Sequence, residues 1–275
     1  MIQNRAMLAR LCISQWTARK HDKTVSAEVE KAHAAHDAGR YNKLLVNKTL
    51  LDPISKLAGA VRTYHYSQTL PWNDGGDRLL PSILFMGYTA EIRKFKAQHQ
   101  ALVQSLVAAY PAEVQAARNR LGTMYDPADY PEAYELNTRF DIAVEFIPVP
   151  DAKDFRVDVS EEAAEEIRTQ ITDSVNARQT QAVKDCYRRV REVVSKLYER
   201  LSIEDAVFKD SLVNNARDLM DVLPGLNITQ DPELDALHQE ISALLVSPQT
   251  LRNNPAARKA TADAADAILS RLSWK

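Results

Sequence analysis

The stretch that decides the fold is Ser160 to Leu201, which reads SEEAAEEIRTQITDSVNARQTQAVKDCYRRVREVVSKLYERL. Serine is a favoured N-cap residue, and glutamates crowd the first turns, where the helix macrodipole favours negative charge. Apolar side chains then recur at three- and four-residue steps, which predicts one long helix that buries a single stripe. The stripe comprises Ile167, Ile171, Val175, Val183, Cys186, Tyr187, Val190, Val194, Leu197 and Leu201. The basic run Arg188-Arg189-x-Arg191 is expected to be a solvated face.

Shorter helices are expected after this one. Ser202 with Asp205 resembles a capping box and predicts a helix that ends near residues 223–225. Asp-Pro at 231–232 and Asn-Pro at 254–255 are cap signals that predict helices through Val246 and Ser273. Residues 160–275 are therefore predicted to be all-helical.

The chain upstream mixes helical and strand patterns. Residues 142–147 and 155–159 alternate apolar and polar positions and are rich in β-branched and aromatic side chains, which predicts two strands. Residues 8–17 alternate in part and are a candidate third strand. Helical spacing predicts further helices over residues 26–39, 44–61, 79–109 and 112–121.

The predicted fold is thus mainly α with a small β element, an α+β protein in two parts. Residues 1–159 form a mixed part with a two- or three-stranded sheet. Residues 160–275 supply the long helix and a C-terminal helical bundle, and the two parts can pack as one domain. The long stripe and the Ala-rich tail also predict self-association into a homo-oligomer.

The net charge of −2 hides a gradient along the chain. Residues 1–66 carry eleven Lys/Arg against five Asp/Glu, whereas residues 151–275 carry 17 against 22. The basic N-terminal quarter fits one localised anionic partner, a solvated basic face, or docking onto the chain's own acidic part.

Composition excludes several classes of protein. No apolar run approaches the roughly 18 residues of a membrane span, and the N-terminus lacks the features of a signal peptide. Two distant cysteines rule out a disulfide framework and favour a reducing cytoplasm. Walker, Rossmann and Gly-x-Ser-x-Gly motifs are missing, so the common nucleotide-dependent enzymes and hydrolases are not indicated.

Residues 62–82, RTYHYSQTLPWNDGGDRLLPS, hold two of the seven glycines of the chain, side by side at Gly75-Gly76. Adjacent glycines between two prolines indicate an ordered loop, which is either a binding surface or a structural clasp. Asp74 and Asp77 flank the glycines and fit a turn role better than cation ligation.

Aromatic residues of the loop and of the basic quarter could stack on bases while neighbouring cations meet phosphates. The alternative is that the aromatic residues anchor the core. The candidate nucleic-acid-binding residues are Trp16, Arg19, Lys20, Arg62, Tyr64, Tyr66, Trp72 and Arg78.

Catalysis and metal binding are the weaker interpretations. His33 and His36 lie three apart on a predicted helix, but no second ligand pair follows. His65 with Asp74 or Asp77 could form an acid–base pair, yet no nucleophile accompanies it. We expect no catalytic residue, no metal and no cofactor.

Several motifs resemble a family of tailed phages and prophages that is described only as a domain of unknown function. They are the run from Thr69 to Pro81 (TLPWNDGGDRLLP), Tyr110-Pro111, residues 120–122, residues 129–131 and the run from Phe146 to Val157 (FIPVPDAKDFRV). The resemblance spans residues 8–201. It implies a phage origin and action in the host cytoplasm, and it supplies no reaction.

The leading hypothesis is a non-enzymatic phage protein that binds single-stranded nucleic acid in replication or recombination. The alternative is a helical interaction protein: a virion component, a partner of a phage or host ATPase, or an inhibitor of host defence. An enzyme is the third interpretation.

Overall fold

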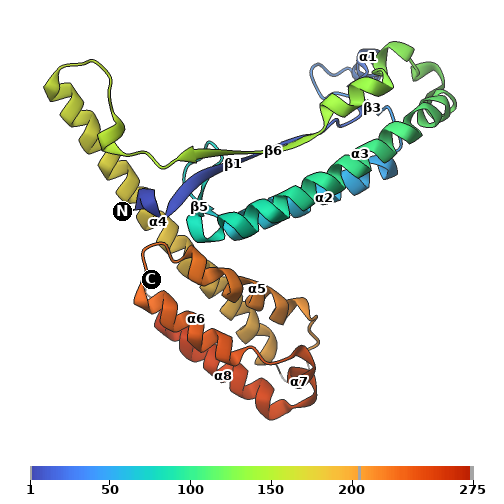
Figure 1. Cartoon of the computed structure of the whole chain (residues 1–275). Helices are drawn as coiled ribbons and strands as arrows, with labels where there is room; N and C mark the ends of the chain where they lie inside the picture. The colour runs from blue at the N-terminus through green and yellow to red at the C-terminus, as the bar shows by residue number, and fades with distance from the viewer. Residues whose placement is uncertain (1, 204–205, 273–275) are drawn as a thin grey trace. The chain divides into compact units, whose positions relative to one another are not determined.

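The computed structural model describes residues 2–203 and 206–272 (Figure 1). The chain forms two compact units, which we call unit 1 and unit 2. Unit 1 contains residues 1–10, 64–88 and 145–275, and unit 2 contains residues 11–63 and 89–144. The division differs from the predicted boundary at residue 160, because residues 1–10 and 64–88 supply strands that belong with the C-terminal helices.

The prediction of a mainly helical α+β protein is confirmed, with 68% helix and 11% strand. The strands are β1 (Ala6–Ser14), β2 (Arg19–His21), β3 (Asn42–Leu44), β4 (Leu70–Pro71), β5 (Asp77–Pro81) and β6 (Asp141–Pro148). The helices are α1 (Lys23–Ala32), α2 (Lys48–Gln68), α3 (Phe85–Leu121), α4 (Glu161–Leu201), α5 (Ser211–Leu226), α6 (Pro232–Leu244), α7 (Pro248–Asn253) and α8 (Pro255–Leu272). Short 3₁₀ helices join several of them.

The larger sheet has the strand order β4-β5-β1-β6, and β2 pairs with β3 in a separate ribbon. Strand β5 runs antiparallel to β1, with Ala6 opposite Pro81 and Arg10 opposite Asp77. The loop predicted between Pro71 and Pro81 is shorter than expected, because residues 77–81 form strand β5 and only residues 72–76 form a turn, between β4 and β5. The predicted strand over residues 155–159 is wrong, because Val157 and Val159 are exposed and no strand of the described residues pairs with this segment.

Helix α4 is the central element of unit 1, and its predicted stripe is confirmed. Seven stripe residues from Val175 to Leu201 are buried, and the helix packs against α8, α5 and β4. The stripe is covered within unit 1, so it gives no reason for self-association, and a homo-oligomer stays a prediction. Asp205 of the predicted capping box lies outside the described residues, and α5 begins only at Ser211.

Unit 2 has its own apolar core around α2 and α3. Ile54 of α2 packs with Val103 and Leu106 of α3 and with Phe140. A second cluster joins residues Ala18, Leu45, Val46, Tyr110 and Leu136. The helices predicted over residues 79–109 and 112–121 form one helix, α3, which contains Pro111 and begins only at Phe85. Residues 79–81, predicted as helix, belong to strand β5. Among the described residues, no helix is both long and apolar enough to cross a membrane.

Candidate nucleic-acid interface

The turn over residues 72–76 is a structural clasp, held by Asp77 at the start of β5. Arg10 of β1 donates from Nε to Asp77 Oδ1 at 2.8 Å, and the Asn73 amide donates to Asp77 Oδ2 at 2.8 Å. The backbone N–H of Asp77 returns a bond to Asn73 Oδ1 at 3.1 Å. The hydrogen bond from Arg10 is the main cause of a lowered pKa of Asp77. The carboxylate therefore holds the turn through side chains and not, as expected for a turn aspartate, through backbone amides.

Trp72 is part of the core of unit 1. Its side chain is 5% exposed and packs in the cluster that contains Leu8, Leu79 and Val190, while Arg178 of α4 lies 5.3 Å from the ring centroid. A base cannot stack on this ring unless the core opens. The polar residues next to Trp72 suggested a binding loop, but the structure shows that Trp72 itself packs in the core.

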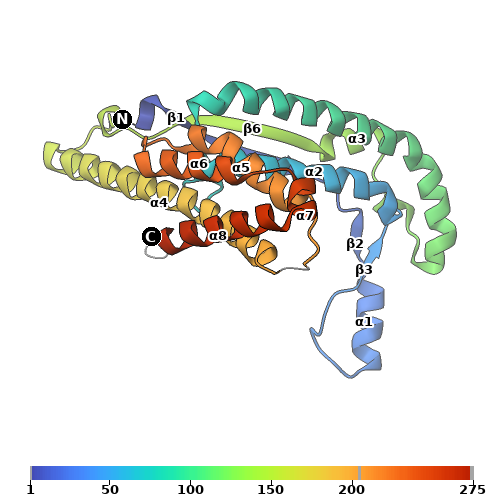
Figure 2. The ribbon, with the colours of Figure 1, turned by 90° about the horizontal axis from the view of Figure 1, so that it is seen from below.

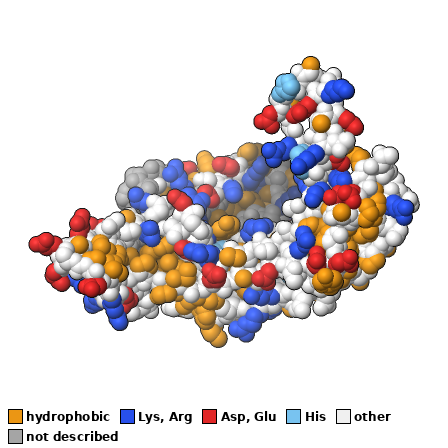
Figure 3. All heavy atoms as spheres, turned by 90° about the horizontal axis from the view of Figure 1, so that it is seen from above, with side chains coloured by type: hydrophobic (Ala, Val, Ile, Leu, Met, Phe, Trp, Pro, Cys, Tyr) orange, Lys and Arg blue, Asp and Glu red, His pale blue; other side chains and the backbone are white. Residues whose placement is uncertain are grey.

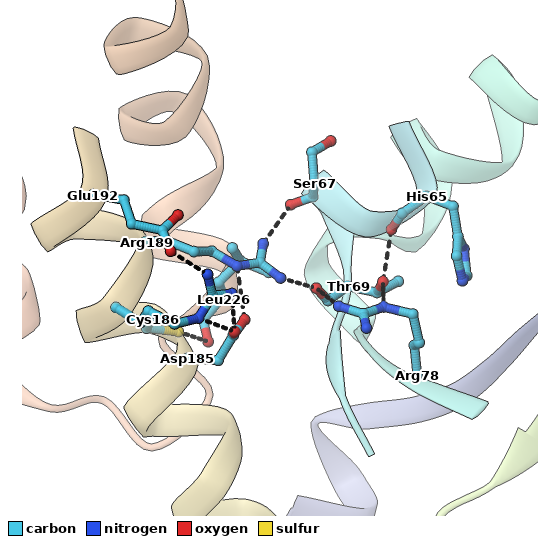
Figure 4. Close-up of polar contacts among 10 residues, drawn as sticks. His65, Ser67, Thr69, Arg78, Asp185, Cys186, Arg189, Glu192 and Leu226 are labelled. Atoms are coloured by element: carbon cyan, nitrogen blue, oxygen red, sulfur yellow. Dashed lines mark hydrogen bonds and ion pairs between the residues drawn. The ribbon is translucent and has the colours of Figure 1, made fainter. Parts of the chain in front are cut away.

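Arg78 and Arg189 close the C-terminal end of α2, whose last carbonyls have no partner inside the helix. Arg78 Nε donates to Thr69 Oγ1 at 2.7 Å, and Arg78 Nη2 donates to the Thr69 carbonyl at 3.1 Å (Figure 4). Arg189 of α4 donates to the carbonyls of Ser67 at 3.1 Å and Thr69 at 2.6 Å. Cations suit this end of a helix because it carries partial negative charge.

Asp185 holds Arg189 in place. Its Oδ2 accepts from Arg189 Nε at 2.7 Å (Figure 4). Its other oxygen pairs with Arg188. The Arg189 side chain is 13% exposed, so the prediction that Arg188-Arg189-x-Arg191 is a solvated face is wrong for Arg189. Helical periodicity alone could not show that Arg189 is largely buried, because the carbonyls to which Arg189 donates lie some 120 residues earlier in the chain.

A buried histidine continues this network. His65 is 2% exposed, its Nδ1 lies 2.8 Å from Tyr88 Oη, and its carbonyl accepts from the Thr69 hydroxyl at 2.6 Å. Burial first, and the charge of Arg78 second, lower the pKa of His65 to about 4. Burial likewise raises the pKa of Tyr88. Within the described part of the chain, His65 forms no hydrogen bond or ion pair with Asp74 or Asp77, so the acid–base pair considered as a weaker interpretation is not assembled.

The other aromatic residues predicted to bind nucleic acid have at least part of their rings covered by neighbouring side chains. Tyr64 stacks on Tyr88 with ring centroids 5.9 Å apart, and Trp16 packs edge-on against Tyr110 at 5.9 Å. Tyr66 is 53% exposed, but the Arg78 guanidinium covers one face of its ring at 4.7 Å. Of the eight candidates, the exposed ones are Tyr66 in unit 1 and Arg19, Lys20 and Arg62 in unit 2.

A projecting segment of unit 2 displays two of these cations. We call residues 19–44 the finger; it consists of β2, α1, the returning loop and β3 (Figure 2). Asp22 caps α1 by accepting from the Val25 N–H at 3.1 Å, and this bond is the main cause of the lowered pKa of Asp22. No residue from 22 to 42 is buried. Isolated helices as short as α1 are marginal in water, so the finger has little to hold it except its base.

Lys43 anchors that base. It is 7% exposed, and its Nζ lies 2.7 Å from Asp129 Oδ2, 2.7 Å from the Met124 carbonyl and 3.6 Å from Asp22 Oδ2. Burial alone would lower the pKa of Lys43, but the hydrogen bond and charge of Asp129 outweigh it and the pKa is raised. The ion pair thus fixes the ribbon from which α1 extends.

Further cations gather around the anchor. Arg19 lies opposite Leu44 in the ribbon, and Arg120 of α3 donates to the Leu44 carbonyl at 2.9 Å. Lys20 Nζ is 3.7 Å from Asp129 Oδ1, and its side chain remains 57% exposed. Figure 3 shows basic side chains on the finger and where it joins the rest of the protein. We call the set Arg19, Lys20, Lys23 and Arg120 the basic root.

The sequence identified part of this surface. Arg19 and Lys20 were predicted, because they are adjacent cations in the basic quarter. Lys23 and Arg120 were missed. Lys23 belongs to no motif, and Arg120, although part of the motif at residues 120–122, comes from a helix 76 residues beyond Leu44. Among the described residues, no group of three or more His, Cys, Asp or Glu side chains could hold a metal ion.

Comparison with known proteins adds no assignment. No family model matches the sequence, and no curated protein or solved structure is detectably similar to it.

Proposed function

We propose that the chain is a non-enzymatic phage protein that binds single-stranded nucleic acid, and that the finger is the contact surface. A role in phage replication or recombination belongs to the same proposal. The motif resemblance described above supports the phage origin and the action in the host cytoplasm. The observation that carries it is the basic root, where Arg19, Lys20, Lys23 and Arg120 surround a ribbon that projects from unit 2.

Charge supports this surface over the loop at residues 72–78. Unit 2 carries 15 Lys/Arg against 12 Asp/Glu, whereas unit 1 carries 20 against 25. An anionic strand is attracted to unit 2 and repelled by unit 1. Because phosphates dominate the affinity of such complexes, binding should weaken steeply with salt.

A single strand fits the finger better than a duplex does. Tyr41 is 42% exposed beside the exposed Arg40, so a base can stack on its ring while the guanidinium meets a phosphate. A duplex offers no unstacked base to this pair. In this proposal, Tyr41 has the base-stacking role that the sequence analysis gave to Trp72.

Fluorescence anisotropy with a labelled oligonucleotide at several salt concentrations tests the proposal. The triple variant Arg19→Gln/Lys20→Gln/Lys23→Gln should bind more weakly, and its plot of log affinity against log salt should be shallower by roughly 2, at about 0.7 per lost phosphate contact. Tyr41→Ala should weaken binding with little change in that slope.

The matched control removes three exposed cations from unit 1, as Lys196→Gln/Lys209→Gln/Lys259→Gln. It changes the net charge by the same amount and should bind nearly as well as the native chain, because these three lysines lie outside the finger. Equal losses in the two triple variants, or no binding by the native chain at low salt, would show that the finger is not a nucleic-acid surface.

A helical interaction protein is the second candidate, and α1 favours it. Val25 and Val29 lie one turn apart on this helix. No residue of α1 is buried, and Val29 is 50% exposed. An apolar pair on an uncovered helix fits a protein groove. Val29→Ser should leave oligonucleotide binding unchanged. If instead it abolishes co-purification of a stoichiometric protein from infected cells, the second candidate is favoured.

A further inference from the structure

One face of α4 borders two adjoining cavities in unit 1. The first, of about 220 Å³, is lined by Lys184, Tyr187, Arg188 and Arg191 of α4 and by Leu272 of α8. The second, of about 360 Å³, shares Lys184 and Tyr187. Its other lining residues are Gln179, Thr180, Val183 and Thr229. Together they form a groove whose two ends differ in chemistry.

The first cavity is cationic. Lys184, Arg188 and Arg191 are spaced four and three residues apart, so they share one face of the helix. Arg188 pairs with Asp185 and with Glu192, but no carboxylate of the described residues lies within 4.0 Å of a Lys184 or Arg191 nitrogen. Over residues 2–203 and 206–272, no carboxylate lines either cavity. This gathering stands out in a unit that carries more Asp/Glu than Lys/Arg.

The second cavity is flatter and less polar. Val183 and the ring of Tyr187 form one wall, and the Tyr187 hydroxyl is fixed by a 2.8 Å hydrogen bond to Asp231 Oδ2. The Thr229 hydroxyl is buried and has no hydrogen-bond partner among the described residues. A buried polar atom without a partner costs free energy unless something else bonds to it. Because this oxygen has almost no accessible surface, the polar edge of a ligand in the cavity would supply that bond once the Thr229 side chain rotates toward it.

We propose that the groove binds a nucleoside monophosphate, either as a free nucleotide or as the 5′-phosphorylated end of a strand. The phosphate lies between Lys184 and Arg191, where charge-assisted hydrogen bonds are strong. The base lies against Val183 and Tyr187, with its polar edge at Thr229. The two volumes together are in the range of small-ligand sites. The groove belongs to unit 1, so the inference does not depend on the finger of unit 2.

Isothermal titration calorimetry on the full chain tests the inference with AMP, adenosine and inorganic phosphate. AMP should bind more tightly than either fragment. A short oligonucleotide with and without a 5′-phosphate separates the two sources of the ligand. This arm uses the Arg19→Gln/Lys20→Gln/Lys23→Gln background, so that binding by the finger does not contribute. Preference for the phosphorylated strand over AMP identifies a strand end, and the reverse identifies a free nucleotide.

Variants then locate the site. Lys184→Gln/Arg191→Gln should weaken AMP binding about tenfold or more, since each lost bond involves a charged group. The control Lys196→Gln/Arg200→Gln removes two exposed cations from the same helix and should bind like the native chain. Thr229→Val should weaken AMP but not inorganic phosphate.

Any one of three results would overturn the inference. The first is equal affinity for AMP and inorganic phosphate. The second is no binding of AMP together with no preference for a phosphorylated strand. The third is unchanged AMP affinity in Lys184→Gln/Arg191→Gln. All three can be obtained whether or not the finger binds nucleic acid, so failure here is distinguishable from failure of the proposed function.

Discussion

The Arg78 guanidinium donates to both the hydroxyl and the carbonyl of Thr69, at 2.7 Å and 3.1 Å. Thr69 is fully buried, and its hydroxyl in turn donates to the His65 carbonyl. A residue that the sequence suggested as a phosphate contact therefore completes the end of α2. The predictions below test this structural role and the other buried contacts.

Arg78→Ala should destabilise unit 1 by about 1–3 kcal/mol, because it leaves the buried Thr69 hydroxyl without its donor. Arg78→Lys should recover only part of this, since an ammonium cannot reproduce the planar two-point contact. Thermal or urea unfolding measures both. An unchanged melting temperature for Arg78→Ala would return this residue to the set of candidate binding residues.

Trp72→Ala should destabilise by about 3–5 kcal/mol, as expected when a buried Trp is truncated. Its ring packs with the core of unit 1 and under Arg178, so Arg178→Ala should cost less than the Trp72 truncation. Urea unfolding of the two variants gives the comparison. Equal melting temperatures of Trp72→Ala and the native chain would contradict a buried role.

The stability of unit 1 should fall as the pH drops from about 6.5 to about 4. His65 has a folded-state pKa of about 4 against an ordinary value of 6.5, so the unfolded chain binds the extra proton first. The stabilisation is complete above pH 6.5, and roughly 3 kcal/mol is lost by pH 4 at ~1.4 kcal/mol per pKa unit. Urea midpoints across this range measure it. In His65→Gln this part of the pH dependence should disappear.

Gly225→Ala should destabilise the contact between α5 and the segment before α3. A Cβ at this position would lie 2.6 Å from Leu84 Cδ2 and 2.8 Å from its Cγ, so Leu84 must move, at a cost of about 1–3 kcal/mol. Gly59→Ala is the matched control, because a Cβ there would meet no neighbouring atom of the described residues within 4 Å. In addition, alanine within a helix is more stabilising than glycine by roughly 0.5–1 kcal/mol. We therefore expect Gly225→Ala to lower the melting temperature and Gly59→Ala to raise it.

The two cysteines should differ in reactivity. Cys12 is exposed, whereas Cys186 is buried and its burial raises the pKa of the thiol to about 12. A disulfide reagent should therefore modify one thiol in the native chain and the second only after denaturation. Rapid reaction of both in the native chain would show that the α4–α5 contact at Cys186 opens easily.

The sequence predicted the features that depend on local periodicity. It did not predict the features that depend on contacts with residues far away in the chain. The stripe of α4 was readable because Val175, Val190 and Leu197 repeat at helical steps over a long window. The burial of Trp72 was not readable, because its neighbours are polar and its covering residue, Arg178, lies in another helix. The division of the chain was missed for the same reason: β5 pairs with β1 across some 70 residues.

The candidate interface shows the same limit. Arg19 and Lys20 were found as adjacent cations, but the salt bridge from Lys43 to Asp129 that positions them joins residues 86 apart. Nothing in the Ala-rich pattern of residues 26–39 indicates that helix α1 is uncovered. Burial depends on what packs against a segment, and a single sequence reveals that only when the partner segment has a matching periodic face.

The uncovered finger has a consequence for how this chain can diversify. Because residues 22–42 contribute nothing to the core of unit 2, substitutions and length changes between the two ribbon strands should leave the rest of that unit intact. The Lys43–Asp129 ion pair would stay constant while the residues of α1 and of the loop that follows it change. Related chains could thus acquire different partners by altering about twenty residues, with no compensating change elsewhere.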